Sequence, residues 1–133
     1  MREILFKAKT FNGKWVQGLL AHKDNKWYIS NKEGMPFAFE VKPETICQYT
    51  GLKDKNDKKI FEGDLILLMD RWYCEVEYDV ENARFILNGE YVKNEDEDED
   101  EDEVTHSSFA PYYQNEIKVI GNIFNNPVII FRQ

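Results

Sequence analysis

A strict two-residue alternation of apolar and acidic side chains is the feature that most constrains how this chain folds. It runs from residue 74 to residue 80 in the order Cys-Glu-Val-Glu-Tyr-Asp-Val. Successive side chains of a β-strand point to opposite faces, so Cys74, Val76, Tyr78 and Val80 share one face and the three acids share the other. The pattern predicts a strand with one face in a core and one face in water.

Several other segments have the composition of short strands joined by tight turns. Asn12-Gly13 separates residues 4–9 from 15–21, and Asn88-Gly89 separates residues 84–87 from 90–93; both dipeptides are typical of hairpins because they tolerate positive φ. Further turns and strands are expected at 22–26, 27–29, 65–68, 117–124 and 128–131. Helical spacing is absent except for one turn at Pro43-Glu44-Thr45. The sequence therefore predicts a mainly β protein with little helix, a barrel or a sandwich.

The charge of the chain is concentrated in one segment. The 133 residues include 25 Asp and Glu against 17 Lys and Arg, a formal charge of −8, but nine of the acids form an uninterrupted run at 95–103. The remaining 16 acids leave the rest of the chain close to neutral. Crowded carboxylates repel one another and bury nothing, so we expect a disordered insert from about residue 94 to 108. The run is interpreted as a solvated tether, a loose collector of divalent cations, or a mimic of a nucleic-acid strand.

The composition indicates a protein of the cytosol. Apolar residues make up 42% of the chain and aromatic residues 14%, enough for a real core. Cys47 and Cys74 have no paired spacing, and the first residues lack the apolar stretch of a signal peptide. The longest apolar run, at 65–69, is far short of the roughly 20 residues that a membrane span needs. We expect no disulfide and no membrane contact.

The segment QYTGLKDKNDKKIFEGDLILL, residues 48–68, has some of the residues of a calcium loop but not its pattern. A calcium loop that starts at Asp54 would have Asn56 at its third position, but Lys58, Lys59 and Leu65 stand where a ligand, a glycine and the final acid belong. We interpret the segment instead as a hairpin that leads into a buried strand. Gly63 would supply a backbone geometry that a side chain obstructs.

The four lysines of this loop, Lys53, Lys55, Lys58 and Lys59, do not predict a nucleic-acid site. Asp54 and Asp57 offset half of their charge, and no aromatic side chain lies among them to stack on a base. The seven glycines of the chain also form no phosphate-binding motif.

Candidates for catalysis or metal binding are few. A hydrolase with a site assembled from Cys47, His22 and Asp64 is kept as an alternative. The cysteines and the two histidines, His22 and His106, lack the close pairs of a zinc site, and Cys74 is expected to be a small core residue. Tryptophans are interpreted as core anchors: Trp15, Trp27 and Trp72. We therefore assign no catalytic, cofactor-binding or metal-binding residue, and no cofactor.

Three stretches resemble the YopX family of small phage and prophage proteins. They are MREILFKAKTFNGKWV at the start, VKPETICQYTG with the segment at 48–68, and EIKVIGNIFNNPVII at the end. The resemblance spans nearly the whole chain in the expected order. It implies an SH3-like barrel preceded by an N-terminal antiparallel hairpin region. It also implies a single domain over 1–133, with the N-terminal β region at 1–50 and the barrel portion, including the acidic insert, at 51–133.

On this resemblance we expect a phage- or prophage-encoded accessory protein in the cytoplasm of a bacterial host cell. It would act by binding, to itself as a homo-oligomer and to a host or phage protein, and not as an enzyme. The alternatives are an acidic inhibitor that mimics nucleic acid toward a basic host protein, and the hydrolase described above. Direct binding of nucleic acid is not expected.

Overall fold

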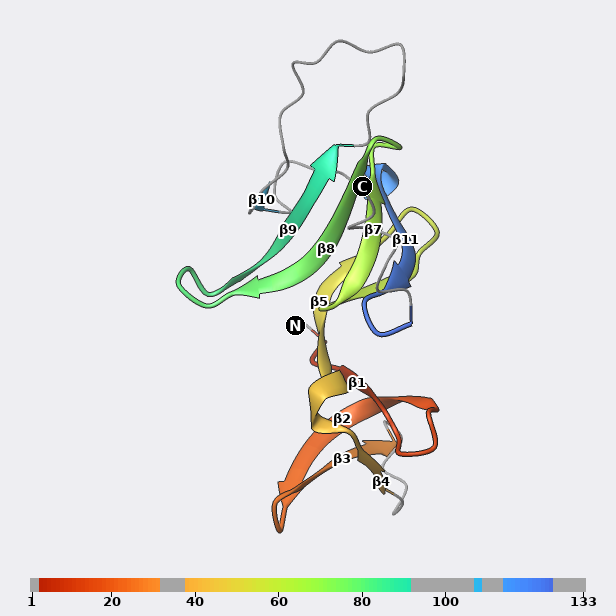
Figure 1. The fold of residues 1–133 in the computed structure, drawn as a ribbon, viewed down its shortest axis with the longest axis vertical. Coiled ribbons are helices and arrows are strands. Elements are labelled where there is room, and N and C mark those ends of the chain that lie inside the picture. Colours follow the sequence, from red (N-terminus) through yellow and green to blue (C-terminus); the bar gives the residue numbers. More distant parts are fainter. Residues whose placement is uncertain (1–2, 32–37, 92–106, 109–113, 126–133) are drawn as a thin grey trace. The chain divides into compact units, whose positions relative to one another are not determined.

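Figure 1 shows the computed structural model of the chain, which describes residues 3–31, 38–91, 107–108 and 114–125. The chain divides into two compact units, Met1–Gly51 and Leu52–Gln133. Both consist of antiparallel strands, and helix in the described residues is limited to the 3₁₀ turns η1 (Pro43–Thr45) and η2 (Gln114–Glu116). The predicted mainly β fold with little helix is confirmed. Within these residues no helix has the length and apolar character needed to cross a membrane.

The first unit is a sheet of antiparallel strands in the order β4-β3-β2-β1-β5. The strands are β1 (Phe6–Lys9), β2 (Trp15–Lys23), β3 (Lys26–Asn31), β4 (Ala38–Val41) and β5 (Cys47–Lys53), and the last two residues of β5 belong to the second unit. The hairpin predicted at Asn12-Gly13 is confirmed: β1 pairs with β2 across this turn, and Gly13 has a φ of 87°.

This first sheet curls over its own core. Thr10, just after β1, forms a bridge with Val41 on the opposite strand β4. A Cβ on Gly18 would lie 1.8 Å from the backbone oxygen of Ser30, so a glycine is needed where β2 and β3 approach this closely. The curl encloses a small core of buried residues with partly buried ones around it: Ala8, Ile29, Val41, Phe6, Val16, Leu20, Trp27 and Ile46.

The second unit contains a sheet in the order β10-β9-β8-β7-β11. Its strands are β7 (Asp64–Leu68), β8 (Trp72–Asp79), β9 (Arg84–Tyr91), β10 (Ser107–Ser108) and β11 (Ile117–Asn122), and β6 (Lys59–Phe61) is the neighbour of β5. The core of this unit contains the following buried residues: Ile60, Ile66, Leu68, Cys74, Val76, Leu87, Ile117 and Val119.

The hairpin turn predicted at Asn88-Gly89 is wrong. β9 continues through both residues and pairs Gly89 with Cys74 of β8. A Cβ on Gly89 would lie 1.9 Å from the backbone oxygen of Tyr73, so this glycine serves a close approach inside the sheet rather than a turn. The turn lies earlier, between Asp79 and Arg84.

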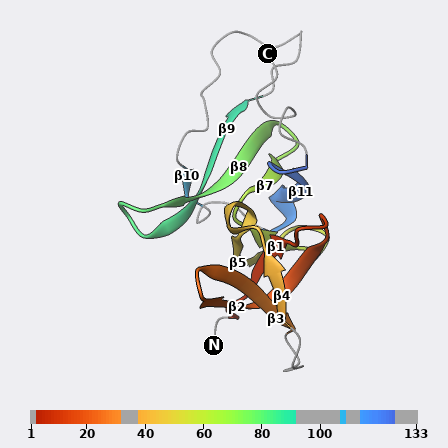
Figure 2. The same cartoon turned by 60° about the horizontal axis from the view of Figure 1, so that its bottom comes forward.

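The alternating segment of β8 is buried only in its first half. Cys74 and Val76 are fully buried, whereas Tyr78 is 42% and Val80 is 81% exposed. The reason is the length of the neighbouring strand, because β7 pairs with β8 only from Trp72 to Glu75. Beyond that point β8 and β9 continue as a hairpin whose tip, residues 78–85, we call the ribbon end. Figures 1 and 2 both show this hairpin extending away from β7 and β11.

Within the described residues neither sheet closes into a barrel, so the SH3-like barrel stays a prediction. The acidic run at 95–103 lies outside the described residues, as do the expected strand at 128–131 and Tyr112-Tyr113. At the end of the segment expected to be disordered, Ser107 and Ser108 form the short strand β10, which pairs with Leu87 and Ile86.

Candidate functional site

Asp54 holds the lysine-rich loop together from inside. Its side chain is fully buried, although it starts a loop of polar residues. Oδ1 accepts hydrogen bonds from the backbone N–H groups of Asn56 and Lys58, both at 2.9 Å, and Oδ2 accepts one from Val119 of β11, also at 2.9 Å. The backbone N–H of Lys55 donates to the carbonyl of Ile117 at 2.9 Å. The loop is therefore a closed hairpin connection that is also tied to β11, and the hairpin interpretation is confirmed.

The electrostatics of Asp54 suit this structural role. Burial raises the pKa of the Asp54 carboxyl. The pKa is lowered by more than this by hydrogen bonds from the backbone N–H groups of Val119, Lys58 and Asn56 and by the positive charge of Lys58. It therefore lies below its usual value. Both oxygens of the ionised carboxylate face N–H groups rather than a cation. Across the part of the chain that the structure describes, no three His, Cys, Asp or Glu side chains are grouped to hold a metal ion.

The Glu-Gly-Asp step is a second structural connection. Gly63 has a φ of 85°, its N–H donates to the carbonyl of Val76 at 2.8 Å, and its own carbonyl accepts from Ile123 at 2.9 Å. The Asp64 carboxylate is buried and accepts the backbone N–H of Phe61 at 2.8 Å. Gly63 has the role predicted for it, and Asp64 closes the turn.

The residues considered for a hydrolase have separate surroundings. The Cys47 thiol is buried and lies 3.3 Å from the carbonyl oxygen of Thr45, to which it donates. The His22 ring is exposed and stacks on Trp27, with ring centroids 4.3 Å apart. Gln17 of β2 and Cys47 of β5 both pair with Lys7, so His22 lies five residues along the sheet from the level of Cys47. At strand spacing this separates the two by roughly 17 Å along the sheet and roughly 10 Å across it.

The other cysteine is a core residue, as predicted. Burial raises the pKa of the Cys74 thiol to about 12, so this sulfur is a neutral thiol at physiological pH. His106 lies outside the described residues. Trp27 and Trp72 are partly buried and pack against the two cores, so they act as the predicted anchors.

Trp15 belongs instead to a basic patch on the outer face of the first sheet, which we call the β1–β2 face (Lys7, Lys9, Trp15, Gln17 and Leu19). Register places Lys9 opposite Trp15 and Lys7 opposite Gln17. The Nζ atoms of Lys7 and Lys9 lie 5.1 and 5.5 Å from the centroid of the Trp15 ring. Leu19, two residues beyond Gln17, leaves 54% of its surface exposed. The patch combines positive charge with apolar surface.

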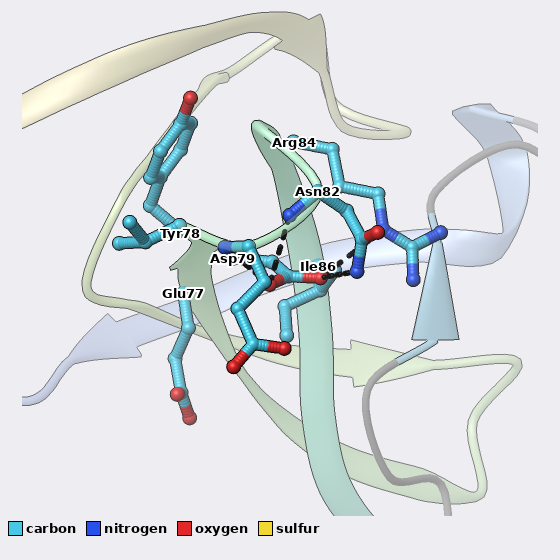
Figure 3. Close-up of a pocket in the computed structure, with 8 residues that line it drawn as sticks. Glu77, Tyr78, Asp79, Asn82, Arg84 and Ile86 are labelled. Carbon is cyan, nitrogen blue, oxygen red and sulfur yellow. Dashed lines mark hydrogen bonds and ion pairs between the residues drawn. The ribbon is translucent and has the colours of Figure 1, made fainter.

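The ribbon end carries the opposite charge. It forms a depression of about 500 Å³, and Figure 3 shows the residues that line it. The lining residues are Glu77, Tyr78, Asp79, Val80, Glu81, Asn82, Arg84 and Ile86. Asp79 accepts hydrogen bonds from Asn82 Nδ2 at 2.8 Å and from Arg84 Nε at 3.4 Å; the bond from Asn82 contributes most to lowering the pKa of Asp79. With Asp79 paired in this way, Glu81 and the neighbouring Glu77, which accepts a hydrogen bond from Asn88 Nδ2 at 2.7 Å, leave the depression negative.

An apolar edge accompanies these charges. Tyr78 and Phe85 pack edge to face with ring centroids 5.1 Å apart, and Val80, in the turn after β8, is 81% exposed. The eight residues that line the depression include no Cys, His, Ser or Lys.

Sequence reasoning missed both surfaces. The alternation in β8 identified the face of Tyr78 and Val80, but the point where the core ends depends on the length of β7. Lys7, Lys9 and Trp15 also alternate in the sequence, and pairing their strands across Asn12-Gly13 could have placed them side by side.

Comparisons with known proteins identify a family and solved structures of similar fold. The crystal structure of protein EF1440 from Enterococcus faecalis is similar to this chain, with a TM-score of 0.50 and 23% sequence identity over 96% of this chain and 97% of that one. At this identity the likeness concerns the fold alone. No curated protein matches the chain. The family described as YopX protein matches residues 6–130. Because this match covers nearly the whole chain, the chain belongs to the YopX protein family.

Proposed function

We propose that this chain is a phage- or prophage-encoded accessory protein that acts by binding, to further copies of itself and to a host or phage protein, in the cytoplasm of a bacterial host cell. The observation that carries the proposal is the ribbon end. There Tyr78 near the end of β8 and Val80 in the turn that follows are 42% and 81% exposed.

The ribbon end should be more stable when a partner protein covers it. A two-stranded hairpin on its own is marginally stable in water, and apolar surface gains about 25 cal/mol for each Å² removed from water. Contiguous exposed apolar surface with a charged rim is characteristic of interaction sites. A partner that covers Tyr78 and Val80 would therefore stabilise both the contact and the hairpin.

Binding is better supported than catalysis. Of the three residues in the hydrolase hypothesis, Cys47 and Asp64 are buried and engaged with backbone groups, and His22 stacks on Trp27. The proposal therefore assigns no enzymatic activity to the chain.

We also propose an SH3-like arrangement for the second unit. Its strands β7, β8, β9 and β10 follow one another as neighbours, and β11 returns to pair with β7. A small barrel needs this order, with the last strand beside the first, and η2 directly precedes the returning strand.

Light scattering after gel filtration tests self-association. At about 50 μM we expect a mass of at least two chains, since contacts of this kind bind in the micromolar range or tighter. A strict monomer at this concentration removes the self-association. Affinity purification from infected or lysogenic cells then tests the binding of a host or phage protein. We expect the native chain to retain a specific protein and the Val80→Lys variant to lose it.

A further inference from the structure

We infer that Asn12 is a site of self-modification, at which the chain converts its own asparagine into aspartate and isoaspartate without an enzyme. The sequence contains two Asn-Gly pairs, at 12–13 and at 88–89. A glycine after asparagine leaves its backbone nitrogen open to approach, because it has no Cβ. The structure puts the first pair in an exposed turn and the second inside a sheet, so the two pairs should react at very different rates.

The reaction needs only water and the atoms of the pair. The backbone nitrogen of Gly13 attacks Cγ of the Asn12 side chain, and the new N–Cγ bond closes a succinimide ring. The bond from Cγ to Nδ2 breaks, and Nδ2 leaves as ammonia with the proton that the Gly13 nitrogen gives up. Water then opens the ring at Cγ to give aspartate, or at the original backbone carbonyl to give isoaspartate. No atom is oxidised or reduced.

The turn between β1 and β2 gives this ring room to form. Asn12 and Gly13 are both exposed. A Cβ placed on Gly13 would meet nothing within 4 Å, so the ring and the attacking water have open space. The Gly13 N–H donates to the Thr10 carbonyl at 2.9 Å, and the nitrogen attacks when this bond opens. A hydrogen bond in an exposed turn opens far more readily than a core strand.

The Thr10 hydroxyl activates the Asn12 amide. It donates a hydrogen bond to Oδ1 of Asn12, the oxygen on which negative charge develops when Cγ is attacked. The same hydroxyl accepts the backbone N–H of Lys14 at 3.1 Å, which leaves its own proton directed toward Asn12. Thr10 is buried and forms a bridge with Val41, so its position is fixed. The fold thus supplies a donor at the reacting amide that an unfolded Asn-Gly pair lacks.

The second pair, Asn88-Gly89, lacks these conditions. Gly89 is buried and pairs with Cys74, and a Cβ on it would lie 1.9 Å from the Tyr73 carbonyl oxygen, so the sheet leaves no room for a ring. The Asn88 amide is also held, because its Nδ2 donates to the Glu77 carboxylate at 2.7 Å. Asn88 therefore reacts only when β8 and β9 separate, and core strands open at free energies close to that of global unfolding.

The product changes the hairpin of the first unit. Each conversion adds one negative charge to the turn. Isoaspartate also lengthens the backbone by one carbon between two strands whose register runs from Lys9 with Trp15 to Phe6 with Gly18. The chain therefore carries a chemical clock in this hairpin, which records the age of each copy.

Peptide mapping by mass spectrometry measures both positions in the full-length chain. The folded protein is incubated at pH 8 and 37 °C in water enriched in oxygen-18, so that conversion in the folded state is separated from conversion during digestion. A parallel sample in 8 M urea measures each pair without the fold. We expect position 12 to convert at least about tenfold faster than position 88 in the folded chain, and the two rates to agree within about threefold in urea.

Three variants identify the groups responsible, and thermal unfolding checks that each is folded. Asn12→Gln, whose longer side chain forms the corresponding ring less readily, should stop conversion at position 12 and leave position 88 unchanged. Thr10→Val, which removes the donor, should slow position 12 by about threefold or more in the folded chain but not in urea. Thr10→Ser keeps the hydroxyl and should restore the native rate.

Equal conversion of the two positions in the folded chain would overturn the inference. So would an unreactive position 12 in the folded chain while the urea sample reacts. A folded Thr10→Val chain that converts as fast as the native one, or faster, would remove the role of the Thr10 hydroxyl and leave the exposed turn as the cause.

Discussion

The buried carboxylate of Asp54 accepts a hydrogen bond of 2.9 Å from the backbone N–H of Val119, which lies 65 positions later in the chain. The same carboxylate closes its own loop through Asn56 and Lys58. One side chain thus joins the hairpin after β5 to β11, and its loss would disturb both. This explains why a loop of lysines and aspartates contains a residue that water does not reach.

Replacing Asp54 with Ala should lower the free energy of unfolding by about 3 kcal/mol, because one buried and two partly buried backbone N–H groups lose their acceptor. Urea denaturation measures the change. Asp57→Asn in the same loop is the control: Asp57 has a φ of 63°, which Asn tolerates, and its exposed carboxylate makes only a 3.9 Å ion pair with Lys53. We expect the control to change stability by less than about 0.5 kcal/mol. Equal effects of the two changes would contradict the role of Asp54.

Asp54 should also make the stability of the second unit sensitive to acid. Its pKa in the folded chain is lowered, so the unfolded chain binds the proton more readily and protonation favours unfolding. The contribution is complete above the unfolded pKa near 3.8 and is lost as the pH falls through the folded pKa. The stability difference between the native chain and Asp54→Ala should therefore shrink between pH 5 and pH 2, measured by urea denaturation at each pH. A difference that is constant over this range would show that the charge of Asp54 is unimportant.

How far the sequence predicted this structure depends on the range of the interactions. Local patterns located the strand at 74–80, the hairpin at Asn12-Gly13 and the bend at Gly63, because period and turn chemistry act over a few residues. Asn88-Gly89 has the same turn chemistry but lies inside β9, since pairing with Cys74 and the close approach to Tyr73 override it. The burial of Asp54 could not be predicted, because its partner Val119 is brought close only by the complete fold.

Local sequence patterns also could not predict the two candidate surfaces. The alternation identified which side chains of β8 share a face, but the short pairing of β7 decides that Cys74 is buried and Val80 is exposed. The β1–β2 face depends on the register between two strands, which no single segment of the sequence contains.

Gly89 and Gly13 should respond differently to alanine. A Cβ at Gly89 would lie 1.9 Å from the Tyr73 carbonyl, a contact that only a backbone shift can relieve, whereas a Cβ at Gly13 would meet nothing within 4 Å. We expect Gly89→Ala to cost more than about 3 kcal/mol, and Gly13→Ala, whose φ of 87° is merely unfavourable for alanine, about 1 kcal/mol. Thermal and urea unfolding compare the two. Similar costs would mean that β8 and β9 are not as close as they are here.

Both cysteines should resist thiol reagents in the folded chain. Cys47 and Cys74 are buried, and the raised pKa of about 12 leaves Cys74 without appreciable thiolate at pH 8. An aromatic disulfide reagent should react with neither thiol within minutes at pH 8, and with both in 8 M urea. Rapid modification of Cys47 in the folded chain would instead give the hydrolase hypothesis an accessible nucleophile.

Deleting the acidic run at 95–103 should leave the folded chain intact and separate two interpretations of its charge. Nine adjacent carboxylates repel one another, so their removal is expected to leave thermal stability unchanged or slightly higher. If the run mimics nucleic acid, the deletion should abolish capture of a basic host protein, and salt should weaken that capture steeply, as it does for phosphate contacts. A matched variant with the nine acids replaced by Ser and Gly keeps the length of the segment and tests the charge alone. Deletion that unfolds the chain, with the Ser-Gly variant equally unfolded, would show that the carboxylates have a specific structural partner and are not a solvated tether.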